Sequence, residues 1–466
     1  MGIKSNRSAF RFRLTVKLMI ALALLLARPP CAVAQTAADA STQAILAEVS
    51  QLMARREYPA ALELFDRISQ AEQQTTEIQL LRASLLNSAG RPADARAIAS
   101  RIVSRESDNV DALLVLAASA ALENKDREQR TFLDRVIRVD PGNLKALSDL
   151  GYIALRAQSL RIAGGHFDKA LAIDGNYREA LVGRAIVYRY AQDPRRSEQL
   201  LNRAIRQNPD WAVPLNERAR LYRGAGFTED ALKDLDEAKR IDPGNYWVSV
   251  DRAAALIDLG RKQDALEELD RAISLDSSGF LAYTYRAGIR DEMGDYNGAE
   301  QDYAVLTRIR PDYYFAAEGL GIIKMRKQDY VGARDAFLAA YRQAPKEYRY
   351  ALLAAANWMK AGRPADPKQF LAQVLRAAPR DSIEWHMLRL YHDLSGDSDA
   401  VARVSQEQNL DAKSKMLFYI ASYYDARGNV ALANRYYIEV RDMNRRGTVE
   451  WKISDVLLEQ RGIDRN

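Results

Sequence analysis

Apolar side chains recur along most of this chain at helical spacing, in pairs of segments of about a dozen residues each. A short turn separates the two segments of a pair. Small residues recur seven positions before the turn and five positions after it, and larger apolar residues such as Phe65, Phe167 and Leu201 follow. Because small side chains let two helices approach closely, the pattern predicts a helical hairpin that is repeated many times.

The boundaries between the predicted hairpins recur every 34 residues, as from Pro209 to Pro243. The phrase IRVDPGN ends at Asn143, and KRIDPGN ends at Asn245, three such intervals later. Proline or glycine stands at most boundaries, where it ends a helix: Pro141, Gly175, Pro209, Pro243, Pro311, Pro345 and Pro379. Glycine also occupies most of the turns within the hairpins, where a helix often ends in a left-handed residue: Gly90, Gly226, Gly260, Gly294, Gly362, Gly396 and Gly428.

With these offsets the sequence resembles the tetratricopeptide repeat (TPR), a 34-residue helix–turn–helix unit. The resemblance implies an all-α fold, a right-handed superhelical α-solenoid of about twelve units that ends in a capping helix. The expected array spans 42–447, and a capping helix with a tail spans 448–466. The expected units start at Thr42, Thr76, Val110, Leu144, Arg178, Ala212, Tyr246, Phe280, Tyr314, Tyr348, Ser382 and Ser414.

Two of these units depart from the pattern. The unit beginning at Tyr348 has Pro367 at a small second-helix position, which is tolerable only in the first turn of a helix. The unit beginning at Ser382 is shorter than the others and places Arg389 where a small residue is expected. We therefore expect a local change of superhelical twist between residues 348 and 413.

Residues 1–34 have the composition of a secretory signal peptide. Basic residues and no acidic ones are followed by an apolar run from Leu18 to Ala27 and by Ala32-Val33-Ala34. The run is too short to span a bilayer as a helix, and no transmembrane span is expected in the mature chain. We expect cleavage after Ala34, a periplasmic protein, and a short linker over 35–41.

Charge and cysteine content both change when this leader is removed. The formal net charge is +6, and the leader carries six basic residues, so the mature chain is balanced. A nucleic-acid partner is therefore not expected, since phosphate binding needs net positive surface. The single cysteine, Cys31, lies in the leader, and we favour its removal with the peptide. The alternative is a lipid-modified cysteine, but Arg28-Pro29-Pro30 precedes it, where lipoprotein cleavage requires small residues.

The exposed inner face of the first helices is the candidate binding surface. Tyr152, Tyr190, Tyr285 and Tyr419 are expected there, because their spacing places them on this face of a first helix, whereas other tyrosines share helix-packing positions of the repeat. The same face carries these polar residues: Asp149, Arg156, Arg189, Asn216, Glu217, Arg220, Arg223, Asp251, Asp291 and Glu292. Arginines beside tyrosines suit carboxylates, carbonyls and aromatic faces of an extended ligand. The alternative is that these charges pair with neighbouring acids.

These considerations define a candidate partner-binding groove and no other site. Its proposed residues are Tyr152, Arg156, Arg189, Tyr190, Asn216, Arg220, Arg223, Asp251 and Tyr285. His166, His386 and His392 are scattered, and the sequence has no phosphate-binding Gly-Lys loop and no nucleophile elbow. We therefore expect no metal, no cofactor and no catalysis.

The TPR resemblance implies a scaffold or adaptor that binds proteins or extended peptides, and the predicted signal peptide places it in the cell envelope. The last unit, KMLFYIASYYDARGNVALANRYYIEV, is similar to the closing repeat of NlpI-like envelope TPR adaptors through Phe418-Tyr419, Tyr423-Tyr424 and Gly428. The alternative is a TPR subunit of an exopolysaccharide secretion apparatus that contacts glycan or the export machinery. Chaperone-tail binding is not expected, because the Lys/Asn/Lys/Arg set that such TPR proteins use is absent.

Overall fold

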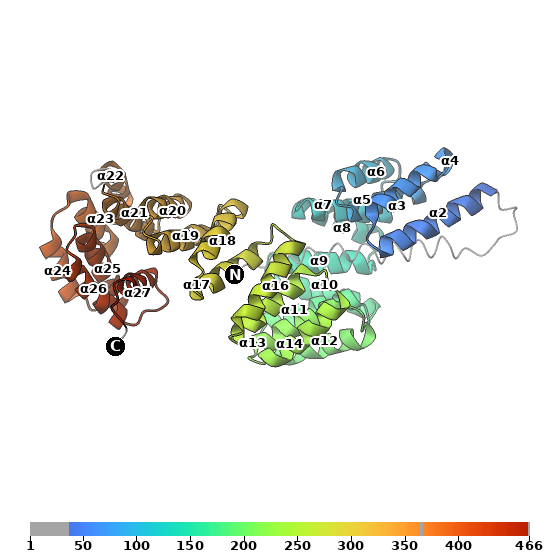
Figure 1. Ribbon diagram of the computed structural model, residues 1–466. Helices are drawn as coiled ribbons and strands as arrows, with labels where there is room; N and C mark the ends of the chain where they lie inside the picture. Colours follow the sequence, from blue (N-terminus) through green and yellow to red (C-terminus); the bar gives the residue numbers. More distant parts are fainter. Residues whose placement is uncertain (1–36, 363–366, 465–466) are drawn as a thin grey trace. The chain divides into compact units, whose positions relative to one another are not determined.

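The computed structural model describes residues 37–362 and 367–464, and the predicted signal peptide and the possible lipid site lie outside them. Within these residues the chain forms 26 α-helices, one 3₁₀ turn (η1, Phe65–Arg67) and no strand, so the all-α expectation is confirmed. Consecutive helices pack against each other along each of two compact units, residues 1–261 and 262–466 (Figure 1). No helix in the described part is both long enough and apolar enough to cross a membrane.

The helices of the first unit begin before the expected array. The first of them starts at Ala37, so the linker predicted over 35–41 is wrong in part, because the alanine-rich stretch favours a helix. The helices are α2 (Ala37–Ala54), α3 (Tyr58–Leu64), α4 (Gln70–Gln73), α5 (Thr76–Ser88), α6 (Pro92–Arg105), α7 (Val110–Leu122), α8 (Asp126–Val139), α9 (Leu144–Arg156), α10 (Leu160–Ile173), α11 (Arg178–Tyr190), α12 (Pro194–Gln207), α13 (Ala212–Gly224), α14 (Thr228–Ile241) and α15 (Tyr246–Asp258).

The second unit continues the alternation of first and second helices. Its helices are α16 (Lys262–Leu275), α17 (Phe280–Glu292), α18 (Tyr296–Ile309), α19 (Tyr314–Arg326), α20 (Tyr330–Gln343), α21 (Tyr348–Lys360), α22 (Lys368–Ala377), α23 (Ile383–Asp393), α24 (Asp397–Gln406), α25 (Leu410–Ala426), α26 (Val430–Asp442) and α27 (Val449–Gln460). From α5 to α21 every first helix begins exactly one repeat interval after the preceding first helix, as the sequence predicts.

The seam within each hairpin matches large side chains to small ones. Phe167 is fully buried between α9 and α11, and a Cβ atom on Gly151 would lie 2.6 Å from its ring. Gly183 on α11 leaves room for the same ring in the same way. In the next hairpin the buried seam residue is Leu201 instead, and the residue that corresponds to Gly151 is Ala185. The sizes of the two facing side chains therefore compensate each other: the larger phenyl ring faces glycine, and the smaller leucine faces alanine.

The predicted turn glycines have the expected left-handed conformation, with φ between 74° and 86°. Units without glycine keep the same turn, because Asn124, Gln158, Gln192 and Gln328 adopt φ between 57° and 60°. The backbone geometry of the turn is thus set by the packing of the two helices, and glycine only makes it easier to adopt.

Arginines at one repeat position join neighbouring hairpins. Arg184, Arg218, Arg252 and Arg286 occupy equivalent positions on successive first helices. Arg218 on α13 donates to Asp234 on α14 at 2.6 and 2.7 Å, and to Asn202 on α12 at 2.6 Å. The planar guanidinium group of Arg218 thereby links the second helix of its own hairpin to that of the preceding one.

The region from α22 to α24 is irregular. These helices have 10 or 11 residues, and Pro367 is the residue directly before α22, where proline interrupts no helical hydrogen bond. Arg389 does not enter the seam of its hairpin. Its side chain is exposed and pairs with Asp393, while Met387 and Leu388 are buried. The first helix α21 contacts both α23 and α25. The expected change of twist here stays a prediction.

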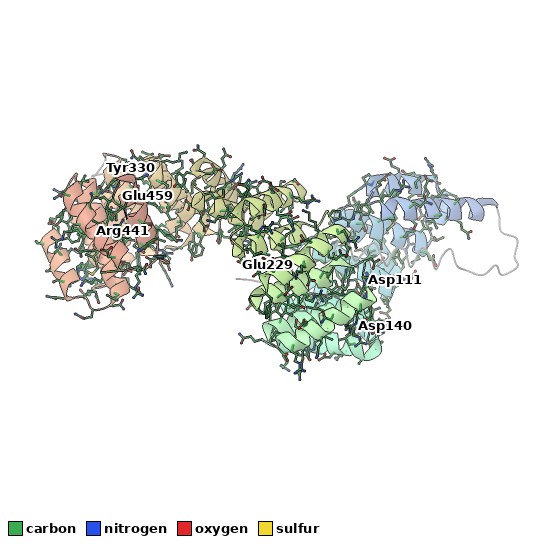
Figure 2. The ribbon with its side chains drawn as sticks, turned by 60° about the horizontal axis from the view of Figure 1, so that its bottom comes forward. Asp111, Asp140, Glu229, Tyr330, Arg441 and Glu459 are labelled. Carbon is green, nitrogen blue, oxygen red and sulfur yellow. The ribbon has the colours of Figure 1, made fainter. Side chains whose placement is uncertain are left out.

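The last helix, α27, is more than an end cap. It packs on α25 and α26 and also contacts α19, which lies far earlier in the chain. The buried Arg441 on α26, labelled in Figure 2, donates to the carbonyls of Ile463 and Asp464 at 2.9 Å, which fixes the segment after α27. Arg326 on α19 lies 3.8 Å from Glu459 on α27.

Candidate functional site

The first-helix face of the first unit brings most of the predicted groove residues together, on α9, α11, α13 and α15. Tyr152 on α9 belongs to the packing of this face. Its hydroxyl donates to the Glu179 carbonyl at 3.0 Å, and its ring meets Phe167 edge-on at 5.1 Å. Arg156 donates to Asp126 and Gln129 on α8 at 3.0 and 3.1 Å. Both side chains therefore link neighbouring helices.

The centre of this face is a network of five charged or amide side chains, which we call the first-helix network: Arg189, Asn216, Glu217, Arg220 and Asp251. Glu217 accepts from Arg189 at 3.2 Å and from Arg220 at 2.6 Å. Asp251 accepts from Arg220 at 2.7 Å and from Asn216 at 2.8 Å. Each of three successive first helices contributes at least one member, so the network crosses hairpin boundaries.

The arginines of the predicted basic stripe are thus paired with acids, which was the alternative interpretation of the sequence. Glu217 is 3% exposed, and burial alone would raise its pKa. The charges and hydrogen bonds of Arg220 and Arg189 outweigh the burial, and the pKa of Glu217 falls below its ordinary 4.5. The two neighbouring acids likewise raise the pKa of Arg220 despite its burial. Glu217 and Arg220 are therefore both ionised at neutral pH.

Aromatic rings border this network and remain accessible. Tyr190 is 40% exposed, and the Arg189 guanidinium lies 4.6 Å from its ring centre. Arg220 lies 5.9 Å from the Trp247 ring. Arg223, the last member of the predicted stripe, pairs with Asp258 at 2.9 Å on the surface. Tyr190, Trp247 and Arg223 can therefore meet a ligand without disturbing the core.

Two tyrosines that the sequence places on the inner face lie in the second unit. Tyr285 is half-buried on α17. The expectation that Tyr419 is exposed is wrong, because α27 covers it. Tyr419 is 2% exposed, and its hydroxyl donates to Glu450 of α27 at 3.3 Å. Repeat position alone could not show this, since the covering helix lies outside the repeat pattern.

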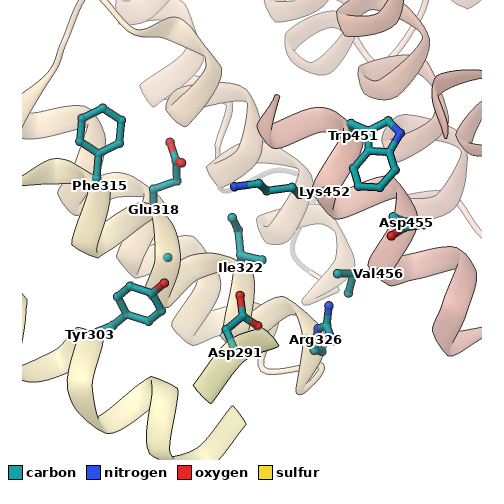
Figure 3. Close-up of a pocket in the computed structure, with 11 residues that line it drawn as sticks. Asp291, Tyr303, Phe315, Glu318, Ile322, Arg326, Trp451, Lys452, Asp455 and Val456 are labelled. Atoms are coloured by element: carbon teal, nitrogen blue, oxygen red, sulfur yellow. The ribbon is translucent and has the colours of Figure 1, made fainter. Parts of the chain in front are cut away.

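A pocket of about 210 Å³ lies where α27 meets α17, α18 and α19 (Figure 3). Its lining residues are Asp291, Tyr303, Phe315, Glu318, Gly319, Ile322, Arg326, Trp451, Lys452, Asp455 and Val456. The sequence singled out Asp291 for the inner face but did not indicate a cavity. The pocket and the four arginines at one repeat position are the features that sequence reasoning missed; only the arginines had a visible signal, their spacing.

Among residues 37–362 and 367–464, no group of three or more His, Cys, Asp or Glu side chains is placed to hold a metal ion. The half-buried His166 lies beside a second, smaller cavity of about 60 Å³ under α10, where burial lowers the pKa of its imidazole. The first-helix face of the first unit and the pocket beside α27 can both bind a ligand through charge, hydrogen bonds and aromatic rings.

Paired helices that bury their apolar faces only against their neighbours define the class of helical repeat scaffolds. Four stretches match the tetratricopeptide repeat family model: residues 46–112, 182–246, 216–280 and 290–348. The chain therefore contains tetratricopeptide repeats. This fold is suited to binding other proteins.

Solved structures with similar folds are TPR proteins or contain them. The APC/C hetero-tetramer Cut9-Hcn1 has a TM-score of 0.52 and 14% identity, covering 75% of this chain and 69% of that one. A tetratricopeptide repeat protein of Parabacteroides merdae has a TM-score of 0.43 and 15% identity, covering 53% of this chain and 98% of that one. The pilF protein of Pseudomonas aeruginosa has a TM-score of 0.40 and 20% identity, covering 44% and 94%. No curated protein matches the sequence.

Proposed function

We propose that this chain is an exported, periplasmic scaffold or adaptor that binds partner proteins on its first-helix surface during envelope assembly or maintenance. It performs no catalysis of its own. The observation that supports the proposal is the first-helix network with its aromatic border. Five polar side chains lie on this face, and their orientation is fixed by mutual hydrogen bonds. A fixed polar layer beside exposed rings is what recognition of a partner chain requires.

The test uses the exposed border, because substitutions inside the network would disturb buried ion pairs. Tyr190→Ala with Arg223→Ala removes an exposed ring and a surface charge, at side chains 40% and 31% exposed. Wild type and variant are used to capture proteins from an envelope fraction. We expect the variant to retain roughly a tenth of the captured partner, since exposed Tyr and Arg residues dominate protein interfaces.

The matched control is Lys233→Ala with Arg240→Ala on the second helix α14, whose side chains are 76% and 71% exposed. It should capture as much partner as wild type. Equal capture by all three proteins would contradict the proposed surface. Polysaccharide in the captured material, with no protein that depends on Tyr190 and Arg223, would favour the secretion-subunit alternative.

A further inference from the structure

The pocket beneath α27 has a floor that carries negative charge and hydrogen-bonding groups. Asp291 at the end of α17 and Tyr303 on α18 both line it, and Figure 3 shows the two side chains in the same part of the cavity. In residues 37–362 and 367–464, no hydrogen bond or ion pair joins the Asp291 carboxylate to another group, and the Tyr303 hydroxyl has no hydrogen-bond partner there either. Gly319 makes room for this arrangement, because a Cβ atom at that position would lie 2.6 Å from the Tyr303 ring.

The walls contain two further carboxylates and two cations. Glu318 accepts from the Tyr350 hydroxyl at 2.5 Å and lies 3.4 Å from Arg349. Asp455 stands on α27 beside Lys452. Arg326 donates to the Tyr296 hydroxyl, and its guanidinium lies 4.4 Å from that ring. Lys452 is exposed, and its side-chain ammonium has no hydrogen bond or ion pair in the described part of the chain.

The uncompensated groups are therefore a half-buried carboxylate at the floor and a solvated ammonium at the rim. Burial raises the pKa of Asp291 although Arg326 and Lys452 act in the opposite direction. A carboxylate held in this way is stabilised most by a cation that reaches it. Aromatic rings add to the attraction, since Phe315 is 45% exposed at the wall and Tyr303 lies opposite it.

We propose that this pocket binds one basic side chain, an arginine or a lysine, presented by a partner protein. The cavity of about 210 Å³ has room for a single long side chain and not for a cofactor-sized molecule. Asp291 accepts the hydrogen bonds of the cation, the Tyr303 hydroxyl supplies a second acceptor, and Phe315 covers the stem. The proposal rests on the adaptor function proposed above in one respect only, namely that a partner protein supplies the basic side chain.

The test measures the pocket alone, with a blocked amino acid as the probe. N-acetyl-arginine methylamide is titrated into the mature chain carrying ¹³C-labelled isoleucine δ1 methyl groups. The Ile322 resonance reports the pocket, and the Ile153 resonance in the first unit serves as the internal control. We expect N-acetyl-arginine methylamide to shift Ile322 alone and N-acetyl-glutamate methylamide to shift neither.

Two substitutions should change the affinity in opposite directions. Asp291→Asn keeps the shape of the side chain and should weaken binding about tenfold, the usual effect of losing one charge-assisted hydrogen bond. Lys452→Ala removes a competing cation and should strengthen binding about twofold. Neither side chain has a pairing partner in the described chain, so the melting temperature should change little.

Binding of the glutamate probe, or a loss of affinity in Lys452→Ala with none in Asp291→Asn, would overturn the proposal. Failure of the arginine probe to shift Ile322 would do the same. None of these results would affect the adaptor function, because that function is tested by partner capture at Tyr190 and Arg223. Conversely, arginine binding with no capture of any partner would leave the pocket established and contradict the adaptor.

Discussion

Two buried carboxylates, those of Glu217 and Asp302, are each held by two arginines. Asp302 on α18 is 2% exposed and accepts from Arg286 at 2.6 and 2.9 Å and from Arg290 at 2.9 Å. Arg286 also donates to Asp270 on α16 at 2.6 Å, but the Asp270 side chain is 58% exposed. One guanidinium group therefore has a buried partner and a solvated partner of the same chemical type.

This pair of partners allows a matched prediction. Asp302→Ala should lower the free energy of unfolding by about 3 kcal/mol, because two arginines lose their buried counter-ion. Asp270→Ala should lower it by about 0.5 kcal/mol, because a surface ion pair contributes little. Urea denaturation measures the loss, and hydrogen exchange of the α17 and α18 amides locates it. Equal losses in the two variants would show that burial does not decide the strength of these pairs.

Glu217 gives the first-helix network a defined pH dependence. In the folded chain its pKa lies below 4.5, whereas an unfolded glutamate titrates near 4.5. The stability that its ionised form contributes is therefore complete above pH 4.5 and is lost as the pH falls through the folded value.

Substitution with an amide should remove this dependence. Glu217→Gln should reduce stability by about 2 kcal/mol at pH 7, because Arg189 and Arg220 lose a buried counter-ion. The difference from wild type should shrink as the pH is lowered from 5 to 3. Urea midpoints across that range measure it, and a difference that stays constant with pH would contradict the assignment.

At the scale of the helices, glycine at position 151 leaves room for the Phe167 ring between neighbouring helices. Gly151→Ala should destabilise the first unit by about 1 to 2 kcal/mol, because the new methyl group meets the Phe167 ring. Gly165→Ala on α10 is the control, since no atom lies within 4 Å of its added methyl group. It should stabilise the helix by about 0.5 kcal/mol.

A second substitution separates crowding from other effects of alanine. Adding Phe167→Leu to Gly151→Ala copies the alanine–leucine pair that Ala185 and Leu201 form in the next hairpin. The double variant should recover part of the lost stability in thermal melts. No recovery would mean that the Phe167 ring is not the source of the destabilisation.

The helices and their boundaries were predictable from the sequence because each depends on local signals. Pro243, Gly260 and the alternation of small and large residues act within a single hairpin. The network around Glu217 was not predictable in the same way. Which charges pair depends on how first helices of successive hairpins face each other, as those carrying Arg220 and Asp251 do. Tyr419 was misplaced for the same reason, since α27 approaches it through tertiary packing alone.

At the scale of the whole molecule, the predicted leader, residues 1–34, differs from the folded array in charge and cysteine content. All six excess positive charges and Cys31 belong to residues 1–34. The proposed export therefore yields a mature chain with balanced charge and no thiol, built of repeats that neither a disulfide nor a metal needs to hold together. A chain of this composition suits an oxidising compartment.

Expression of the full chain in a bacterium tests this proposal directly. We expect a periplasmic product whose intact mass and first residue place its start at Gln35, because signal peptidases cut after small residues. Ala34→Trp should block that cut and leave the precursor at the membrane. Cys31→Ser should have no effect on the mature product, because the thiol is removed with the leader. A mature chain that begins with a lipid-modified Cys31, and disappears in Cys31→Ser, would instead make the protein a membrane-anchored lipoprotein.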